Sequence, residues 1–478
     1  MRLWAAAALA AYFLFFFRLT GAGLAGPDEP RYAWVGREMA RSGDWVTPRL
    51  WGRPWFEKPA LLYWTTAAAF RAGLGEDWAP RLPVAVLSVL FLLFFFWRLK
   101  VELGNPAAGY ATGVLATCAG WVAYSRVAVF DLPLSAAFGA AMLALLAWLE
   151  RRQTRWLTSF GAFLGVSVLA KGLVGPALAA LTLLCWSARN GLRELWSPLR
   201  PAALLVFLAV ASPWYVLCYL RNGAPFLAEF FWRQHFSRYA AGALAHNQPL
   251  WYFAPVLAVG LLPWTPLLTA FGAKTLWRER KLFFFLAWAA VTVIFFSFSR
   301  DKLPAYVLPA LPAIAALAGA ALARAKPMPI ALSLCAATLA LFPAAAAILP
   351  EALDSGARAA LRTAAFPARD MAAAAALAAC VVLFERIGRR QAAVAVVLAA
   401  SVAGYIWIAQ TSFRLIDQKA GARSLWRQIQ GRQQDLCLDG APRSVAYGLY
   451  YYAGRIVPDC SVEPRPVHIR DNEAVLHF

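Results

Sequence analysis

The sequence predicts an all-α membrane protein that crosses the bilayer many times. Of its 478 residues, 61% are hydrophobic and only 15% are charged, and the mean hydropathy is +0.56, which is too apolar for a soluble globular chain. Apolar runs long enough to span a bilayer recur along nearly the whole length, and the weak alternating pattern of an outer-membrane barrel is absent.

The net charge of +21 would indicate nucleic-acid binding in a soluble protein. Here most Lys and Arg residues stand in short segments between apolar runs, as membrane topology requires. No nucleic-acid partner is therefore expected, and the partners include membrane lipids.

The first apolar run, LWAAAALAAYFLFFF, follows Arg2 as the core of a signal peptide would. Arg18 interrupts the approach to the small residues of GAGLAG, and many further spans follow, so an uncleaved first helix is favoured. Counting stretches of ~17–20 residues predicts about thirteen membrane helices. They are expected at 3–20, 82–97, 106–123, 133–149, 156–170, 173–187, 201–220, 250–270, 282–297, 304–322, 329–349, 371–385 and 392–409.

The segments between the spans indicate the orientation. With a cytoplasmic N-terminus, the inside loops are all net positive, as the positive-inside rule expects: RLKVELGN, ERRQTR, SARNGLRELWSPLR, GAKTLWRERK, RAKP and ERIGRRQ. An odd number of spans then places the C-terminus outside, together with the long loops 21–81, 221–249 and 350–370. No internal repeat or inverted symmetry is visible, which counts against common transporter designs.

Two domains are predicted, a membrane domain at 1–410 and a small outside domain at 411–478. The tail begins with an amphipathic helix and continues with SVAYGLYYYAGRIV, whose Val and Tyr content predicts a strand or hairpin. A small α/β domain is therefore expected. In an oxidising compartment, Cys437 and Cys460 of this tail could form a disulfide worth roughly 3 kcal/mol; two unpaired thiols are the alternative.

The first outside loop, 21–81, carries a high density of charge. Its sequence predicts a helix with Asp28 as N-cap and Gly43 as its stop. A second, apolar helix is expected from about Pro59 to Phe70, which at ~12 residues is too short to span a bilayer. Both helices are expected to lie along the membrane surface.

Polar residues of complementary type stand at the outside ends of the apolar spans. Acids come from the first third of the chain and bases mainly from the second half. The set comprises Asp28, Glu29, Arg31, Glu57, Lys58, Arg126, Asp131, Arg233, His235, Arg238, Tyr239, His246, Arg300, Lys302 and Tyr306.

Each of these residues alone has a structural explanation. Asp28 and Asp131 could cap helices, and Glu57 with Lys58 could be a solvated pair. Lys302 and Lys171, which has no clear partner in the sequence, could snorkel to the interface. Together, however, carboxylates facing Lys, Arg, Tyr and His at one membrane surface are what a reaction on an anionic lipid headgroup requires.

These residues lie in motifs that resemble a known family. DEPRYAWVGREMARSGDWVTPRLWGRPWFEKP is similar to the first periplasmic loop of bacterial GT-C glycosyltransferases related to lipid A aminoarabinose transferase and, more distantly, to protein O-mannosyltransferases. FDLPL, AKGLVGP, SPWY, HFSRY and DKLPAYVLP resemble later landmarks of these enzymes, so the likeness covers most of residues 10–315. The resemblance implies a GT-C fold with thirteen membrane helices, interfacial helices in the first loop and a periplasmic C-terminal domain.

The resemblance also implies an activity. A hexosyl or pentosyl group would pass with inversion from a polyprenyl-phosphate donor, such as one built on undecaprenyl phosphate, to lipid A or another periplasmic acceptor at the bacterial inner membrane. The alternatives are a protein O-glycosyltransferase acting on Ser or Thr, and a lipid or sugar transporter without enzymatic activity. The C-terminal third departs from the family apart from DQKAGARSL, so the sugar and the acceptor are not identified.

Site residues carry over from the family by position. Asp28, Glu57 and Asp131 match catalytic acids. The residues expected to bind substrate are Arg31, Lys58, Arg238, Lys302 and Tyr306. By analogy with related enzymes, Glu57 and His235 would hold a divalent metal ion, although two ligands do not specify a metal.

Overall fold

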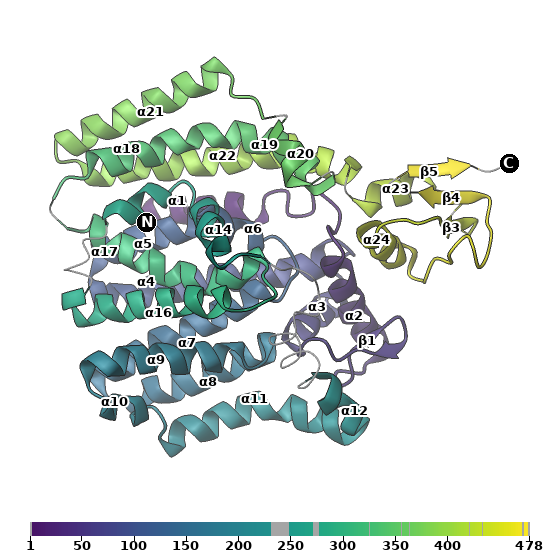
Figure 1. The fold of residues 1–478 in the computed structure, drawn as a ribbon, viewed down its shortest axis with the longest axis horizontal. Coiled ribbons are helices and arrows are strands. Elements are labelled where there is room, and N and C mark those ends of the chain that lie inside the picture. Colours follow the sequence, from purple (N-terminus) through teal and green to yellow (C-terminus); the bar gives the residue numbers. More distant parts are fainter. Residues whose placement is uncertain are drawn as a thin grey trace.

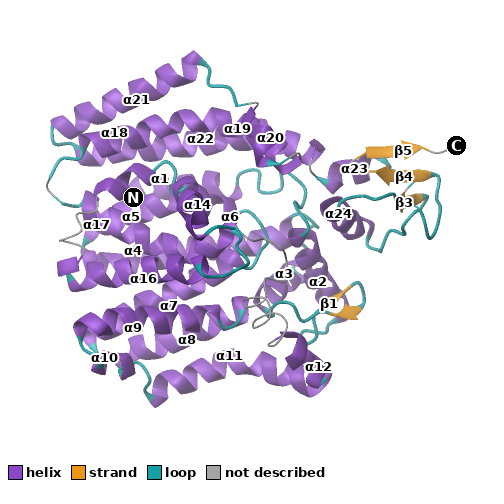
Figure 2. Cartoon of the chain, in the orientation of Figure 1, coloured by secondary structure: helices purple, strands orange, loops and turns teal. Residues whose placement is uncertain are grey.

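The computed structural model describes residues 2–230, 248–270, 277–324, 326–354, 356–362, 364–419, 421–432, 434–470 and 473–476. Its helices form a bundle, and a small lobe with the C-terminus projects from one end (Figure 1). Colouring by secondary structure places β3, β4 and β5 in this lobe and purple helices through the rest (Figure 2). The expected all-α membrane domain with a small α/β addition is therefore observed.

Seven helical segments of the described chain are long and apolar enough to cross a membrane, so the chain is a multi-span membrane protein. They are α4 (Trp78–Leu103), α7 (Asp131–Arg151), α11 (Pro201–Asn222), α16 (Arg280–Ser297), the pair η5 (Pro304–Ala310) and α17 (Leu311–Leu322), the run of α18 (Pro329–Ala337), η6 (Thr338–Ala340) and α19 (Leu341–Asp354), and α22 (Arg390–Lys419).

Shorter or less apolar helices coincide with the other expected spans. These are α1 (Arg2–Ala11) with η1 (Tyr12–Phe16), α5 (Asn105–Thr117), α6 (Ala119–Tyr124), α8 (Thr154–Lys171), α9 (Val174–Asn190), α14 (Phe253–Gly260) and α21 (Ala368–Arg386). Connecting pieces are α10 (Arg193–Trp196), α12 (Ala224–Leu227), η3 (Leu250–Tyr252), η4 (Thr265–Ala270) and α20 (Ala357–Arg362). The total of thirteen spans stays a prediction.

Helix α7 forms the centre of the bundle. Its apolar window is buried in full, because Ala and Leu cover every side of the helix and α4, α8 and η5 pack around it. Helix α4 instead turns Leu90, Leu93 and Trp97 outward, where they are about half exposed. Such apolar exposure is expected where a helix faces lipid.

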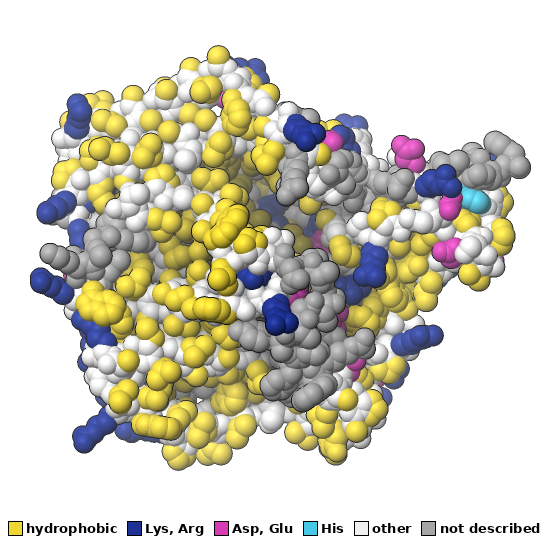
Figure 3. Space-filling view, viewed as in Figure 1, with side chains coloured by type: hydrophobic (Ala, Val, Ile, Leu, Met, Phe, Trp, Pro, Cys, Tyr) yellow, Lys and Arg dark blue, Asp and Glu magenta, His cyan; other side chains and the backbone are white. Residues whose placement is uncertain are grey.

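The two ends of the bundle differ in charge. Lys and Arg side chains line the end opposite the C-terminal lobe, on the left in Figure 3. Near the ends of α4 and α7 and at the start of α16, three cations, Arg98, Arg151 and Lys281, pair with the buried carboxylate of Glu102. This distribution agrees with the positive-inside pattern, while the orientation of the termini stays a prediction.

The first loop forms the two expected helices, and a two-stranded hairpin connects them. Helix α2 (Asp28–Ser42) ends at Gly43 in the left-handed conformation, with φ of +72°. The hairpin pairs β1 (Arg49–Leu50) with β2 (Arg53–Pro54), and α3 (Leu61–Arg71) follows. The expected N-cap role of Asp28 is wrong. Pro27 occupies the N-cap, and Asp28 is the first helical residue, paired with Arg31 one turn later.

The C-terminal lobe contains α23 (Ala422–Gln428), β3 (Leu436–Leu438), α24 (Arg443–Ala453), β4 (Val467–Arg470) and β5 (Glu473–Leu476). Strand β4 is central, parallel to β3 and antiparallel to β5. Cys437 and Cys460 form the disulfide that the sequence allowed.

The strand expected at SVAYGLYYYAGRIV is wrong, because most of this segment forms α24. Val445, Leu449 and Tyr452 are buried at spacings of four and three residues, which makes one helical face. Gly454, with φ of +69°, ends the helix. The strand propensity of Val and Tyr is overridden by the packing of this face.

Candidate active site

The acids and bases of the first loop form one connected network. Arg31 pairs with Asp28 on its own helix, and its Nη1 lies 3.6 Å from Oε2 of Glu57. Nζ of Lys58 lies 3.3 Å from Oε1 of Glu57. The β1–β2 hairpin reverses the chain between α2 and Glu57 and thereby places two carboxylates and two cations together.

The carboxylates around Arg31 keep its guanidinium charged in spite of its burial. Burial alone would lower the pKa of its guanidinium, but the carboxylates of Glu57 and Asp28 outweigh it and raise the pKa. The side chains of Arg31, Glu57 and Lys58 are all less than one fifth exposed, whereas that of Asp28 is 46% exposed. Asp28 is therefore the group of this network that is most accessible to a second substrate.

The C-terminal lobe contributes to the network. Arg31 Cζ lies 5.7 Å from the ring centre of Trp55 and 5.6 Å from that of Tyr447, which belongs to α24. Trp51, in the hairpin, also packs against Tyr447 with ring centres 5.0 Å apart. The aromatic wall above Arg31 is thus built from both domains, which the sequence did not indicate.

A second polar group lies at the ends of α7, α8 and η5. Nζ of Lys171 lies 2.5 Å from Oδ1 of Asp131 and 4.9 Å from the centre of the Tyr306 ring. Asp131 is the first residue of α7 and Lys171 the last of α8. Lys171 therefore has the partner that the sequence did not reveal, and snorkelling does not explain it.

Aromatic contacts join the two polar groups. The ring of Phe130, just before Asp131, lies 4.8 Å from that of Tyr32 on α2 and 5.2 Å from that of Tyr63 on α3. Phe56, just before Glu57, shares a small buried cluster with Leu169 near the end of α8. Buried aromatic and aliphatic side chains thus connect the first-loop network to the second polar group.

Two members of the expected set have structural contacts. Glu29 is buried and accepts two hydrogen bonds of 2.7 Å from Arg81 and one of 2.9 Å from the backbone N–H of Ala128. Arg126 donates to the carbonyl oxygens of Leu14 and Phe17, at 2.8 and 2.6 Å. Arg126 thus ties the loop before α7 to the first span, and Glu29 ties the same loop to α2 and α4. The role of Arg81 was not predicted from the sequence, because this residue stands at the start of an apolar run.

The later loops are only partly described. Lys302 is buried and its Nζ donates to the carbonyl oxygen of Gln248 at 2.9 Å. His235 and Arg238 lie outside the described residues, as do Arg233, Tyr239 and His246. Their proximity to the other site residues stays a prediction.

The described residues around Glu57 fit an anion better than a metal ion. A divalent cation at Glu57 would lie close to both Arg31 and Lys58, which already bind this carboxylate. Elsewhere in the described chain, Cys437, Cys460 and His468 lie close enough to share an ion, but the disulfide removes both thiolates. The expected pairing of Glu57 with His235 at a metal stays a prediction.

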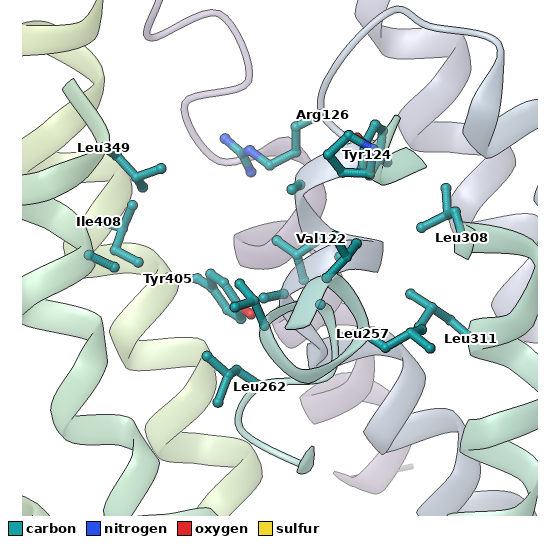
Figure 4. A pocket seen from close by; sticks show the side chains of 18 of the residues that line it. Val122, Tyr124, Arg126, Leu257, Leu262, Leu308, Leu311, Leu349, Tyr405 and Ile408 are labelled. Atoms are coloured by element: carbon teal, nitrogen blue, oxygen red, sulfur yellow. The ribbon is translucent and has the colours of Figure 1, made fainter. Parts of the chain in front are cut away.

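An apolar cavity of about 650 Å³ adjoins the second polar group. Its walls come from α6, α14, η5, α17, α19 and α22, with Leu257, Leu308 and Ile408 among the lining residues (Figure 4). Tyr124 and Arg126 lie together at one end, in the upper part of Figure 4. Pro304 and Val307 of η5 line the cavity, and Tyr306 of the same segment packs against Lys171, so η5 connects the cavity to the second polar group.

Comparison with known proteins finds similar glycosyltransferases. Residues 57–217 match the family described as dolichyl-phosphate-mannose-protein mannosyltransferase. Two relatives are undecaprenyl phosphate-alpha-4-amino-4-deoxy-L-arabinose arabinosyl transferases, from Pseudomonas aeruginosa (33% identity over 330 residues) and Pseudomonas fluorescens (32% over 331 residues). Each alignment covers 66% of this chain, and the chain spans only 59% and 55% of the two relatives.

Solved structures agree with these matches. ArnT from Cupriavidus metallidurans bound to undecaprenyl phosphate matches with a TM-score of 0.78 and 27% identity, over 96% of this chain and 87% of that one. Its apo state matches with a TM-score of 0.75 and 26% identity, over 98% and 92%. The GT-C fold and the resemblance to aminoarabinose transferases are thereby confirmed.

Proposed function

We propose that this aminoarabinose-transferase-like chain is a membrane glycosyltransferase that takes a sugar from a polyprenyl-phosphate donor. The observation that carries the proposal is an apolar cavity of about 650 Å³ with η5 as one of its walls, where Tyr306 of η5 packs against Lys171 of the Asp131–Lys171 pair. A lipid phosphate needs an apolar cavity, because burial of its hydrocarbon chain is favourable, and it needs nearby cations, because these bind its phosphate. The bound lipid of the similar Cupriavidus protein, undecaprenyl phosphate, has this chemistry.

In the proposed site, the isoprenoid chain of the donor lies in the cavity and its phosphate is bound by cations at the polar end. Lys171 from α8 and Arg31 and Lys58 from the first loop would share this role. Each is now paired with a carboxylate, so a bound phosphate would compete for the cations and release the carboxylates. Tyr306 lies beside Lys171 and would border the phosphate.

Transfer breaks the bond from the sugar anomeric carbon to the donor phosphate oxygen and forms a bond to the acceptor oxygen on the opposite face. Polyprenyl phosphate leaves with the bonding electrons, and the cations stabilise its charge. Asp28, the most exposed carboxylate of the network, would face the acceptor. A hydroxyl acceptor needs a base to remove its proton, whereas a phosphate acceptor is already anionic and needs only positioning.

The acceptor and the sugar are part of the proposal. The names of the relatives favour a pentose, 4-amino-4-deoxy-L-arabinose, and an acceptor such as the lipid A phosphates; a hexose remains the alternative. Protein O-glycosylation is the second candidate, because the mannosyltransferase family match spans Glu57, Lys58, Asp131 and Lys171. The reaction would take place at the periplasmic face of the inner membrane, with the N-terminus cytoplasmic and the C-terminal lobe periplasmic.

Transfer by the purified protein tests the activity. With polyprenyl-phosphate-linked sugar and extracted acceptor, wild type should transfer sugar, and Asp28→Asn and Lys58→Ala should each lose most of the activity. Asp370→Asn on α21, far along the chain from the network, is the control and should remain active. Full activity of both site variants would refute this site assignment.

The acceptor class and the transporter alternative need a cellular experiment. Mass spectrometry of lipid A, other glycolipids and periplasmic proteins from wild-type and deletion cells should show one fraction that lacks a sugar. Loss from lipid A supports the glycolipid acceptor, and loss from proteins supports the O-glycosyltransferase. If no fraction changes and purified protein moves donor lipid without consuming it, the chain is a transporter.

The cavity can be tested separately from the charges. Leu308→Trp should fill part of its volume and raise KM for the donor. Leu90→Trp, on the outward face of α4 where Leu90 is 57% exposed, is the matched control. Equal donor KM values for both variants would exclude the cavity as the lipid site.

A further inference from the structure

A second pocket, of about 490 Å³, lies where the end of the first span meets α22 and α23. Four arginines line it: Arg18, Arg414, Arg423 and Arg427. Asp417 is the carboxylate of its wall, and Gln418, Ser424 and Gln428 supply neutral polar groups. The residue types are those that bind a phosphorylated sugar, since Arg forms paired hydrogen bonds with phosphate and amides and hydroxyls bind sugar hydroxyls.

The pocket carries a surplus of positive charge. The charge of Arg423 is compensated, because its guanidinium pairs with Asp77 at 2.7 Å and with Asp417 at 3.0 Å. Arg423 is also only 7% exposed. Arg18 donates to the carbonyl oxygens of Ala409 and Gln410, which leaves its charge uncompensated. Within the described residues, no carboxylate lies within ion-pair distance of Arg18, Arg414 or Arg427, and Arg414 and Arg427 are exposed.

The backbone at Arg18 is held in an unusual conformation. Its φ of +51° lies in the left-handed region that non-glycine residues seldom adopt. Two contacts hold this turn in place: Gly21 N donates to the carbonyl oxygen of Arg18 at 2.9 Å, and Arg423 donates to the carbonyl oxygens of Thr20 and Gly21. Arg423 thus stabilises the turn that directs Arg18 to the pocket.

The pocket adjoins the apolar cavity but is separate from the donor cations. Phe413 lines the cavity, and its ring lies so close to Gly21 that a Cβ there would be 3.1 Å from it. On the other side, Arg81 pairs with Glu29 of α2 and donates to the carbonyl oxygens of Leu19, Ala22 and Gly23, which ties the turn beside the pocket to the helix that carries Asp28. A ligand in this pocket would therefore bind beside the first-loop network and not on its cations.

We infer that the pocket binds the phosphate of the acceptor, an anionic glycolipid with a phosphorylated sugar headgroup. The inference rests on the proposed function and adds a recognition site for the acceptor. Helix α23, which supplies four of the lining residues, belongs to the C-terminal lobe at one end of the bundle (Figure 1), where a lipid headgroup would lie. Arg414 and Arg427 bind one phosphate of the acceptor while the reacting group of the same lipid extends toward Asp28.

Equilibrium binding to the intact protein tests this inference without requiring activity. The protein is placed in nanodiscs of zwitterionic lipid, and binding of diphosphorylated lipid A is compared with binding of its dephosphorylated form. The variants are Arg414→Gln, Arg427→Gln and the double variant. Arg432→Gln, an exposed arginine of the same tail that does not line the pocket, is the matched control.

The double variant should bind diphosphorylated lipid A at least tenfold more weakly than wild type, since hydrogen bonds to charged groups are lost. The control should bind like wild type, and the dephosphorylated lipid should bind all proteins weakly and equally. Unchanged binding by the double variant would overturn the inference. Equally tight binding of phosphatidylglycerol, or full competition by millimolar inorganic phosphate, would overturn the acceptor assignment in favour of a general anion site.

Kinetics separate this inference from the proposed function. If wild type transfers sugar, the double variant should raise KM for the acceptor and leave KM for the donor unchanged. A rise in donor KM instead would assign the pocket to the donor and overturn the inference. If wild type binds the phosphorylated lipid through these arginines but never transfers sugar, the proposed function fails while the binding site stands.

Discussion

Lys171 donates to Asp131 across a distance of 2.5 Å, joining the end of α8 to the start of α7. Asp131→Asn and Lys171→Met should each reduce transfer at least tenfold. The double variant should lose less than the product of the two single losses, because the residues act as a pair. Initial rates of all four proteins form the test, and strictly multiplicative losses would show that the pair does not act as a unit.

The Glu29–Arg81 pair is expected to stabilise the fold and not to react. Both side chains are buried, so Glu29→Gln leaves the guanidinium without its counter-charge and should cost roughly 3–5 kcal/mol of unfolding free energy. Thermal unfolding in detergent measures the loss. Glu463→Gln removes a pair whose side chains are one third to one half exposed, and should leave the unfolding midpoint nearly unchanged. An unchanged midpoint for Glu29→Gln would contradict the structural role.

The hydroxyl of Tyr63 has no hydrogen-bond partner among the described residues. It is buried near the indole N–H of Trp55, and neither atom has a well-formed hydrogen bond within the described part of the chain. Tyr63→Phe should therefore leave thermal stability unchanged or slightly higher, while KM for the donor rises. Tyr110→Phe, at the opposite end of the bundle, serves as control. A loss of stability without a change in KM would assign the hydroxyl to the fold.

The protonation of Tyr63 also predicts a pH dependence. Burial, followed by the charge of Glu57, raises the pKa of Tyr63 well above its ordinary value. The neutral phenol is thus favoured in the folded state, and this contribution is lost only as the pH rises through the raised pKa. Neither transfer nor stability should fall through this group between pH 7 and about pH 10. A fall in wild type that Tyr63→Phe abolishes would contradict this assignment.

The Glu57 network makes the metal hypothesis testable. Because Arg31 and Lys58 already compensate Glu57, transfer should persist after treatment with EDTA and dialysis. Metal analysis of the purified protein accompanies the assay. Activity lost to EDTA and restored by Mg²⁺ or Mn²⁺ would instead support a metal held by Glu57 and His235.

Contact between the domains predicts a role for the C-terminal lobe. Tyr447 of α24 lies beside both Arg31 and Trp51, so Tyr447→Ala should reduce transfer several-fold by loosening the aromatic wall above Arg31. Val462→Ala, on the same lobe where Val462 is 82% exposed, should leave transfer unchanged. Equal rates for the two variants would separate the lobe from the site.

The sequence was sufficient for features that depend on local pattern. Apolar runs predicted the membrane helices, and α2 ends at Gly43 as expected because its left-handed φ of +72° suits a residue without a Cβ. The motif from Asp28 to Lys58 predicted a site at the first loop, and Asp28, Arg31, Glu57 and Lys58 do lie in one network. The prediction from local pattern was wrong at α24. The Val and Tyr residues of this segment favour a strand, but packing of one face of the segment stabilises a helix.

By itself, then, the sequence determined a polytopic helical protein with a charged first loop, because hydrophobic length and residue order act within each segment. Only the tertiary structure decided which charges meet. It paired Lys171 with Asp131 and Glu29 with Arg81, and it brought Tyr447 to Arg31 across almost the whole length of the chain. The physical reason is that ion pairs and cavities depend on distances between segments, and these distances are set by how helices pack rather than by any one segment.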